Sequence, residues 1–276
     1  MKHSEAKLNI SRSKAAKSKR AISSVISTII LTGILLTILL VASFVSLNIL
    51  SNQMASTEFD IAKSNMLLLD STIQDVSLRP GAGGNVQFNE RTGGIGLATT
   101  TDSLSITATD GQTSQSLPPF NNLIQLVYSG GTLASAAVNP STGYTPLRGD
   151  PANAYVTLTQ GLGYLRLQQD NGAKIKLDYD RVRIVSTGLI DSQGTNLVQI
   201  TFVHLVKGEI SAASGTVNIM VQNIQTNPTT WTFERPDISV IIQKTTSSQT
   251  YTVTPPDGTL RTVVVFSEIQ VGVSIR

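Results

Sequence analysis

An uncharged stretch near the N-terminus constrains this chain of 276 residues more than any other feature. Residues 21–57 contain no Asp, Glu, Lys or Arg, and residues 22–50 consist mainly of Ile, Leu and Val. About 20 apolar residues in a helix cross a hydrocarbon core of about 30 Å. Residues 22–50 are therefore long enough to span a membrane, and no other part of the sequence could do so.

The positive charge of the chain is concentrated just before this apolar run. Residues 1–20 contain seven Lys and Arg residues and one Glu, a net charge of 7 − 1 = +6, whereas the whole chain has a net charge of +3. The rest of the chain therefore carries 3 − 6 = −3, which makes nucleic acid an unexpected partner. By the positive-inside rule, residues 1–20 face the cytoplasm and the chain after about residue 50 lies outside.

The composition also excludes several kinds of site. The chain has no cysteine, so a disulfide scaffold, a cysteine zinc site and a thiol nucleophile are ruled out. The two histidines, His3 and His204, are far apart in the sequence, and the glycine-rich residues 81–84 and 93–96 lack the Lys and Ser/Thr of a phosphate-binding loop. We therefore expect no enzymatic activity, no cofactor and no metal.

The junction between the basic tail and the apolar run permits three interpretations. Lys19, Arg20 and Ala21 come directly before Ile22, with the basic residues on the cytoplasmic side of the helix. A cleaved secretory signal would have a shorter apolar core, followed by small residues. A plain uncleaved anchor is the second interpretation.

The third interpretation is a resemblance to the class III signal peptide of archaeal type IV pilins. The sequence Ile22-Ser23-Ser24-Val25-Ile26 is similar to the start of these pilins, although Ser24 stands where proline is common and the glutamate of many bacterial pilins is missing. The resemblance implies that a prepilin peptidase cuts between Ala21 and Ile22. It also implies that the helix stays on the mature protein and packs against copies of itself or other pilins in a filament.

An amphipathic pattern continues the helix beyond the membrane. Apolar residues follow one another at spacings of three and four, which predicts a heptad seam on a helix. They are Phe59, Ala62, Met66, Leu69, Ile73 and Val76. The intervening polar positions are Glu58, Asp60, Lys63, Ser64, Asp70, Ser71, Gln74 and Asp75. The seam either docks against the chain's own head, which we favour, or forms a coiled-coil stalk between two anchored chains.

Beyond the seam the helical period disappears. We predict a helix over residues 22–78, a hinge rich in Pro and Gly at 79–84, and a β-rich head over 85–276, preceded by a leader at 1–21. Many short β-branched runs with turn residues between them favour an antiparallel β-sandwich-like head, so the fold class is α+β. Asp170-Asn171-Gly172 and Pro255-Pro256-Asp257-Gly258 predict hairpin turns, and residues 107–151 read mainly as long loops.

Two groups in the head are possible sites. Asp178-Tyr179-Asp180 offers two carboxylates to a cation, but the neighbouring basic residues favour a solvated strand face. His204 lies within an apolar run and reads as a core or edge histidine, because spacing assigns it no catalytic partner.

These observations favour a subunit of a pilus-like surface filament that acts in adhesion or surface interaction. The alternatives are a minor pilin or pseudopilin of a secretion or uptake machine, and a monomeric membrane-anchored protein whose head binds a sugar or peptide. A surface hydrolase has the weakest support. The sequence indicates no particular surface ligand for the head.

Overall fold

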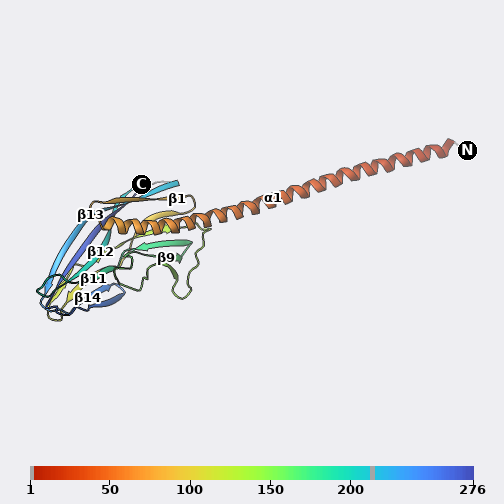
Figure 1. Ribbon diagram of the computed structural model, residues 1–276. Helices are drawn as coiled ribbons and strands as arrows, with labels where there is room; N and C mark the ends of the chain where they lie inside the picture. The colour runs from red at the N-terminus through yellow and green to blue at the C-terminus, as the bar shows by residue number, and fades with distance from the viewer. Residues whose placement is uncertain (1–2, 212–214) are drawn as a thin grey trace. The chain divides into compact units, whose positions relative to one another are not determined.

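The computed structural model describes residues 3–211 and 215–276 (Figure 1). Side chains are described from residue 26 onward. The chain divides into two compact units, Met1–Gln53 and Met54–Arg276. Helix α1 (His3–Ser77) contributes to both units. It begins before the predicted residue 22, since residues 3–21 contain no Gly or Pro to interrupt it.

The end of α1 is fixed by local chemistry and by a distant side chain. Pro80 and Gly81, which has a φ of 76°, follow the last helical turn and prevent its continuation. The buried amide of Asn223 lies 3.4 Å from the main-chain carbonyl oxygens of both Val76 and Ser77, which have no partner within the helix. The helix therefore ends one residue before the predicted position.

Three β-sheets make up the rest of the second unit. Sheet A contains, in spatial order, β1 (Gly83–Glu90), β13 (Gly215–Phe233), β16 (Arg261–Ile275), β12 (Thr195–Ile210), β11 (Val182–Leu189) and β8 (Tyr155–Val156). Sheet B contains β2 (Gly94–Thr99), β6 (Ile124–Ser129), β10 (Ala173–Asp178), β9 (Tyr164–Gln169) and β7 (Tyr144–Arg148). Sheet C contains β15 (Ser247–Val253), β14 (Ile238–Lys244), β3 (Ser103–Thr109) and β4 (Ser114–Ser116), and β5 (Phe120–Asn121) also pairs with β3.

The fold class is α+β, with a long N-terminal helix followed by a mostly β domain. The expectation of a wholly antiparallel head is wrong, because β12 pairs with β16 in parallel and β11 pairs with β8 in parallel. The cause is the position of β16, which lies between β12 and β13 and separates these consecutive strands. β16 is antiparallel to β13 and is therefore parallel to β12.

Two hydrophobic cores share the long strands of sheet A. The first core joins the second half of α1, sheet B and one end of sheet A, and the second core joins sheet C to the other end of sheet A. Neighbouring residues on β12 show the division, since Phe202 belongs to the second core and Val203 to the first. Successive side chains on a strand point to opposite faces, so the two cores lie on opposite faces of sheet A.

The two predicted turns had different outcomes. Asp170-Asn171-Gly172 joins the antiparallel strands β9 and β10, and the positive φ values of Asn171 (48°) and Gly172 (112°) match its turn chemistry. The hairpin predicted at residues 255–258 is wrong, because β15 pairs with β14 rather than with β16. The predicted loop region 107–151 also contains β4, β5, β6 and β7.

Candidate functional site

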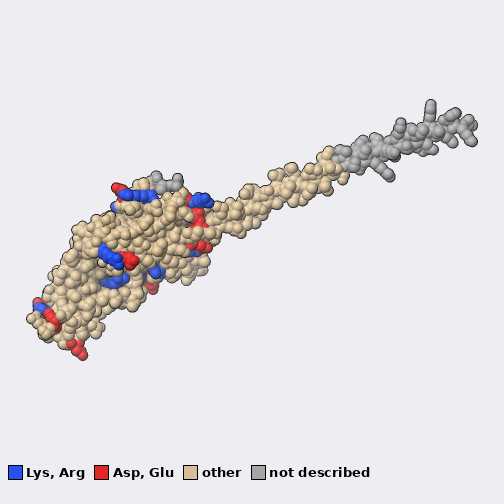
Figure 2. Space-filling view, turned by 45° about the horizontal axis from the view of Figure 1, so that its top comes forward, with Lys and Arg blue, Asp and Glu red and all other residues tan. Residues whose placement is uncertain are grey.

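The first candidate surface is the apolar part of α1 in the first unit. The large apolar side chains of residues 26–50 are each between 48% and 67% exposed. This part of the helix carries no charged residue, and it appears uniformly tan in Figure 2, whereas charged side chains are scattered over the second unit. The helix is long and apolar enough to cross a membrane. So large an exposed apolar surface indicates contact with lipid or with a partner.

The predicted processing residues lie at the start of this surface. The backbone of Lys19, Arg20, Ala21 and Ile22 belongs to α1. Their side chains lie outside the part of the chain whose side chains the structure describes.

The predicted seam lies in the second unit and is buried. Phe59, Ala62, Met66, Leu69, Ile73 and Val76 are all at most 4% exposed. All six belong to the first core, where they pack with sheets A and B. The head's own core therefore occupies the seam, so these six residues are not available to form a coiled-coil stalk.

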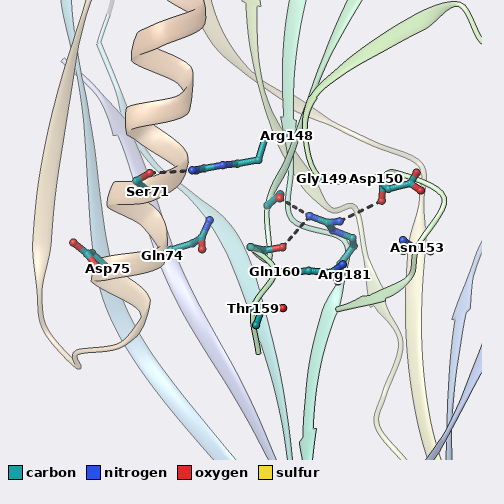
Figure 3. A pocket seen from close by; sticks show the side chains of 12 residues that line it. Ser71, Gln74, Asp75, Arg148, Gly149, Asp150, Asn153, Thr159, Gln160 and Arg181 are labelled. Carbon is teal, nitrogen blue, oxygen red and sulfur yellow. Dashed lines mark hydrogen bonds between the residues drawn. The ribbon is translucent and has the colours of Figure 1, made fainter. Parts of the chain in front are cut away.

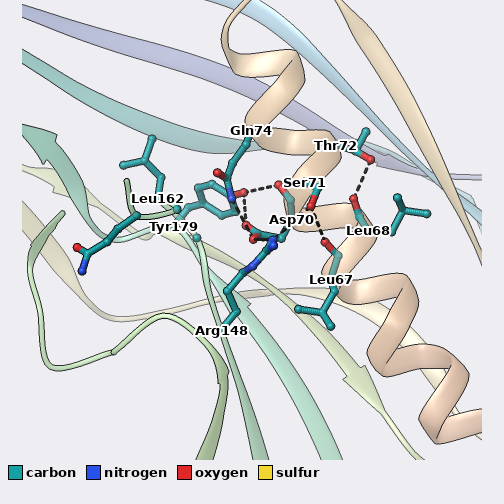
Figure 4. A network of polar contacts seen from close by, with 12 residues as sticks. Leu67, Leu68, Asp70, Ser71, Thr72, Gln74, Arg148, Leu162 and Tyr179 are labelled. Atoms are coloured by element: carbon teal, nitrogen blue, oxygen red, sulfur yellow. Dashed lines mark hydrogen bonds and ion pairs between the residues drawn. The ribbon is translucent and has the colours of Figure 1, made fainter. Parts of the chain in front are cut away.

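A buried carboxylate lies on the same stretch of helix. Asp70 belongs to the polar positions of the sequence pattern, yet it is fully buried (Figure 4). Its Oδ2 accepts hydrogen bonds from Arg148 Nη1 at 2.8 Å and Gln74 Nε2 at 3.0 Å, and its Oδ1 accepts one from the Tyr179 hydroxyl at 2.6 Å. These three donors offset the cost of removing the charge from water.

Tyr179 and Gly163 make the close approach to Asp70 possible. Burial, followed by the negative charge of Asp70, raises the pKa of Tyr179 well above its ordinary value, so the hydroxyl remains a donor. A Cβ at Gly163 would lie 2.1 Å from Asp70 Oδ1 and 2.8 Å from the Tyr179 ring. Gly163 therefore leaves the space in which this pair meets.

A second carboxylate ties the helix to the turn between β1 and β2. Glu58 accepts hydrogen bonds from the main-chain amides of Arg91 (3.0 Å) and Thr92 (3.1 Å) and from the hydroxyls of Thr92 (2.8 Å) and Tyr128 (3.2 Å). Desolvation opposes the charge, but the hydrogen bonds from Thr92, Arg91 and Gly93 outweigh it and lower the pKa of Glu58. Glu58 and Asp70 thus anchor α1 to the head at two points.

A polar pocket of about 540 Å³ lies beside the Asp70 network (Figure 3). It is lined by Ser71, Gln74 and Asp75 of α1, by Arg148 and by loop residues around Asp150 and Gln160. Both charge signs are present at its wall, so the lining suits a polar ligand with donors and acceptors better than a simple anion.

Arg181 forms part of the wall of this pocket, but its donors are already used. Its guanidinium donates to the main-chain carbonyls of Leu162 (3.1 Å), Asp150 (3.2 Å) and Gly161 (3.0 Å), and also to that of Gly163. Desolvation lowers the pKa of Arg181, and nearby Asp180 acts in the opposite direction. The side chain therefore holds these loops together and does not present a free cation to the pocket.

The solvated strand face predicted for Asp178-Tyr179-Asp180 is wrong. Asp178 is 6% exposed, and the side chain of Asp180 is 17% exposed. Cations from other strands compensate the two charges, since Arg166 Nη2 of β9 lies 3.4 Å from Asp178 and Lys244 Nζ of β14 lies 2.9 Å from Asp180. The cations that the two carboxylates face are therefore the Arg166 and Lys244 side chains of the same chain. Local sequence could not reveal these partners because they are distant in the chain.

His204 is a partly exposed strand residue. Its Nδ1 lies 3.0 Å from Glu268 Oε1, and Phe120 and Phe202 lie near its ring. Among the described residues, no three His, Asp or Glu side chains gather closely enough to hold a metal ion.

Comparisons with known proteins give no match. No family model, no curated protein and no solved structure is similar to the chain.

Proposed function

We propose that this protein is a structural subunit of a type IV pilus-like surface filament, acting in adhesion or surface interaction. In this proposal a prepilin peptidase removes residues 1–21, and the apolar helix of the mature chain packs with copies of itself or with other pilins. The β-sandwich-like head is then displayed at the cell surface. The head itself needs no catalytic group for this role.

The uncharged, exposed apolar surface of residues 26–50 carries the proposal. A membrane anchor accounts for this surface alone, but a simple anchor needs no continuous helix beyond it. Here the same helix continues into the core of the second unit, where the six seam residues are buried. A helix that is apolar all round in one half and docked to a head in the other suits a subunit that polymerises through the first half.

The charge distribution supports the direction of insertion. The net charge of +6 on residues 1–20 favours a cytoplasmic leader, and the uncharged run that follows favours a single span. The head would then lie outside the cell. Cleavage on the cytoplasmic side would remove the basic residues and keep the helix.

The mature N-terminus provides the test. The full chain should be expressed in a host with an archaeal prepilin peptidase, and sheared surface material should be examined by mass spectrometry and electron microscopy. A mature chain that begins at Ile22 and forms filaments supports the proposal. An intact Met1, or a start near Phe44, would overturn it.

Variants at the junction make this test specific. Arg20→Glu and Ala21→Glu should leave the precursor uncut and abolish filaments. Arg12→Glu is the matched control, because it makes the same charge change away from the cut and should be processed normally. If Arg20→Glu and Arg12→Glu are processed equally well, a prepilin peptidase does not recognise this junction.

A monomeric membrane-anchored binding protein is the second candidate, and the polar pocket beside Arg148 favours it. A minor pilin of a secretion or uptake machine would use the same helix and junction. An anchored monomer would keep residues 1–21, remain in the membrane fraction and give no filaments, whereas a minor pilin would be processed but scarce in sheared material.

A further inference from the structure

We propose that Lys244 and Asp180 become joined by an intramolecular isopeptide bond between Lys244 Nζ and Asp180 Cγ. Nζ lies 2.9 Å from Asp180 Oδ2, and the two side chains are only 11% and 17% exposed. The other lysine–aspartate pairs among the described residues are more open to water. Lys63 and Asp60 are 28% and 65% exposed, and Lys174 and Asp170 are 25% and 71% exposed.

The surroundings of Asp180 favour an amide over an ion pair. Asp180 Oδ1 is buried and has no hydrogen-bond partner. A buried ion pair is stable only when the remaining polar atoms are also satisfied, because both charges have been removed from water. An amide would replace the two charges with one neutral group and would eliminate one of the two carboxylate oxygens.

The reaction is a condensation and needs no oxidant or reductant. A proton passes from the Lys244 ammonium to the Asp180 carboxylate, which leaves a neutral amine beside a neutral acid. The amine nitrogen attacks Cγ, and the new N–C bond forms as the C–O bond to the hydroxyl breaks. The nitrogen loses a proton, the departing hydroxyl gains one, and water leaves. Holding the reactants together lowers the entropic part of the barrier.

We assign the transfer of the proton to a second buried acid, Asp178, whose charge interacts with that of Asp180. Asp178 lies two residues from Asp180, and burial, opposed by the charge of Arg166, raises the pKa of its carboxyl. Asp180 adds to this rise through its own negative charge, so the two groups interact. The Tyr164 ring centroid lies 6.0 Å from Lys244 Nζ and 5.2 Å from the Arg181 guanidinium, so an aromatic ring and a second cation border the site.

The bond would connect parts of all three sheets. Lys244 ends β14 of sheet C, and Asp180 lies between β10 of sheet B and β11 of sheet A. Closing the chain between residues 180 and 244 would stabilise the head by restricting its unfolded state. This inference does not depend on the proposed filament.

The mass of the full chain, purified in detergent and fully denatured, tests the proposal. We expect a mass lower than the sequence mass by one water molecule, and a proteolytic peptide that contains both Lys244 and Asp180. A chain of unchanged sequence mass with no such peptide would overturn the proposal. This measurement uses the wild-type protein, so it does not depend on whether any variant folds.

Three variants assign the bond to these two residues. Lys244→Met should have its full sequence mass, and Lys174→Met, which removes the exposed pair with Asp170, should still show the loss of one water. Asp180→Asn should lose ammonia in place of water, and its linked form should have the same mass as the linked wild-type chain. A loss of water that persists in Lys244→Met would contradict the assignment.

The part played by Asp178 has a kinetic test. When the chain is recovered unfolded from inclusion bodies, before the bond has formed, and is then refolded, Asp178→Asn should lose water more slowly than the wild type, as followed by mass over time. An unchanged rate would remove Asp178 from the reaction.

Discussion

The hydroxyl of Tyr179 donates a hydrogen bond of 2.6 Å to the buried carboxylate of Asp70, and so joins the segment after β10 to the long helix. The sequence pattern places Asp70 among the polar positions of α1, yet its side chain is buried on the side of the helix that carries the seam. Arg148 and Gln74 complete its set of donors. The helix is therefore held by a specific polar contact as well as by apolar packing.

Tyr179→Phe should lower the free energy of unfolding by about 1.5 to 3 kcal/mol, because a hydrogen bond to a charged acceptor is lost inside the protein. Urea denaturation of the chain in detergent would measure the change. Tyr144→Phe is the matched control, since the Tyr144 hydroxyl makes no hydrogen bond among the described residues. Equal effects of the two variants would contradict the role of the contact.

Gly163→Ala should destabilise the head by about 1 to 3 kcal/mol, since an added methyl group would overlap Asp70 and the Tyr179 ring. Gly96→Ala makes the same change where nothing lies within 4 Å, and should have little effect. Thermal unfolding of both variants would show the difference, and a neutral Gly163→Ala would mean that the pair can move apart without cost.

Leu69→Ala should lower the free energy of unfolding by about 2 to 5 kcal/mol, because Leu69 is fully buried in the first core. Its neighbour Leu68 is 56% exposed, so Leu68→Ala should change stability by no more than about 0.5 kcal/mol. The two variants remove the same atoms one residue apart. Similar urea midpoints would show that the seam is not packed against the head.

Glu58 should make stability depend on acid pH. Its pKa in the folded chain lies below the ordinary value of 4.5, so its contribution is full above that pH and is lost as the pH falls through the folded pKa. Between about pH 6 and about pH 3, Glu58→Gln should therefore show a smaller loss of stability than the wild type. Glu209→Gln, at an exposed side chain, serves as control. If the free energy of unfolding of Glu58→Gln fell as steeply with decreasing pH as that of the wild type, Glu58 would not be the group responsible.

The helix and its seam could be predicted because their signals are local. The spacing of three and four identified six apolar residues that the structure buries, and Pro80 with the following glycines marked the helix end to within one residue. The turn at Asp170-Asn171-Gly172 was also readable, since its conformation needs residues that tolerate positive φ.

The polar contacts of the head could not be predicted because their partners are distant in the chain. Asp70 reads as a solvent-facing residue until Tyr179 and Arg148 are placed beside it. Asp180 reads as a surface carboxylate until Lys244 is known to face it. The turn at residues 255–258 shows the same limit, since Gly258 adopts the expected positive φ of 83° while β15 pairs with β14.

The place of β16 in sheet A has a consequence for the order of assembly. β16 contributes Val264 and Phe266 to the second core and Val271 and Val273 to the first, and it separates β12 from β13, which both precede it in the chain. Neither core can close before residues 261–275 are available. A chain that emerges from the N-terminus must therefore wait, with one edge of β12 and one edge of β13 unpaired, until this strand arrives between them. During that interval the head would depend on protection from aggregation.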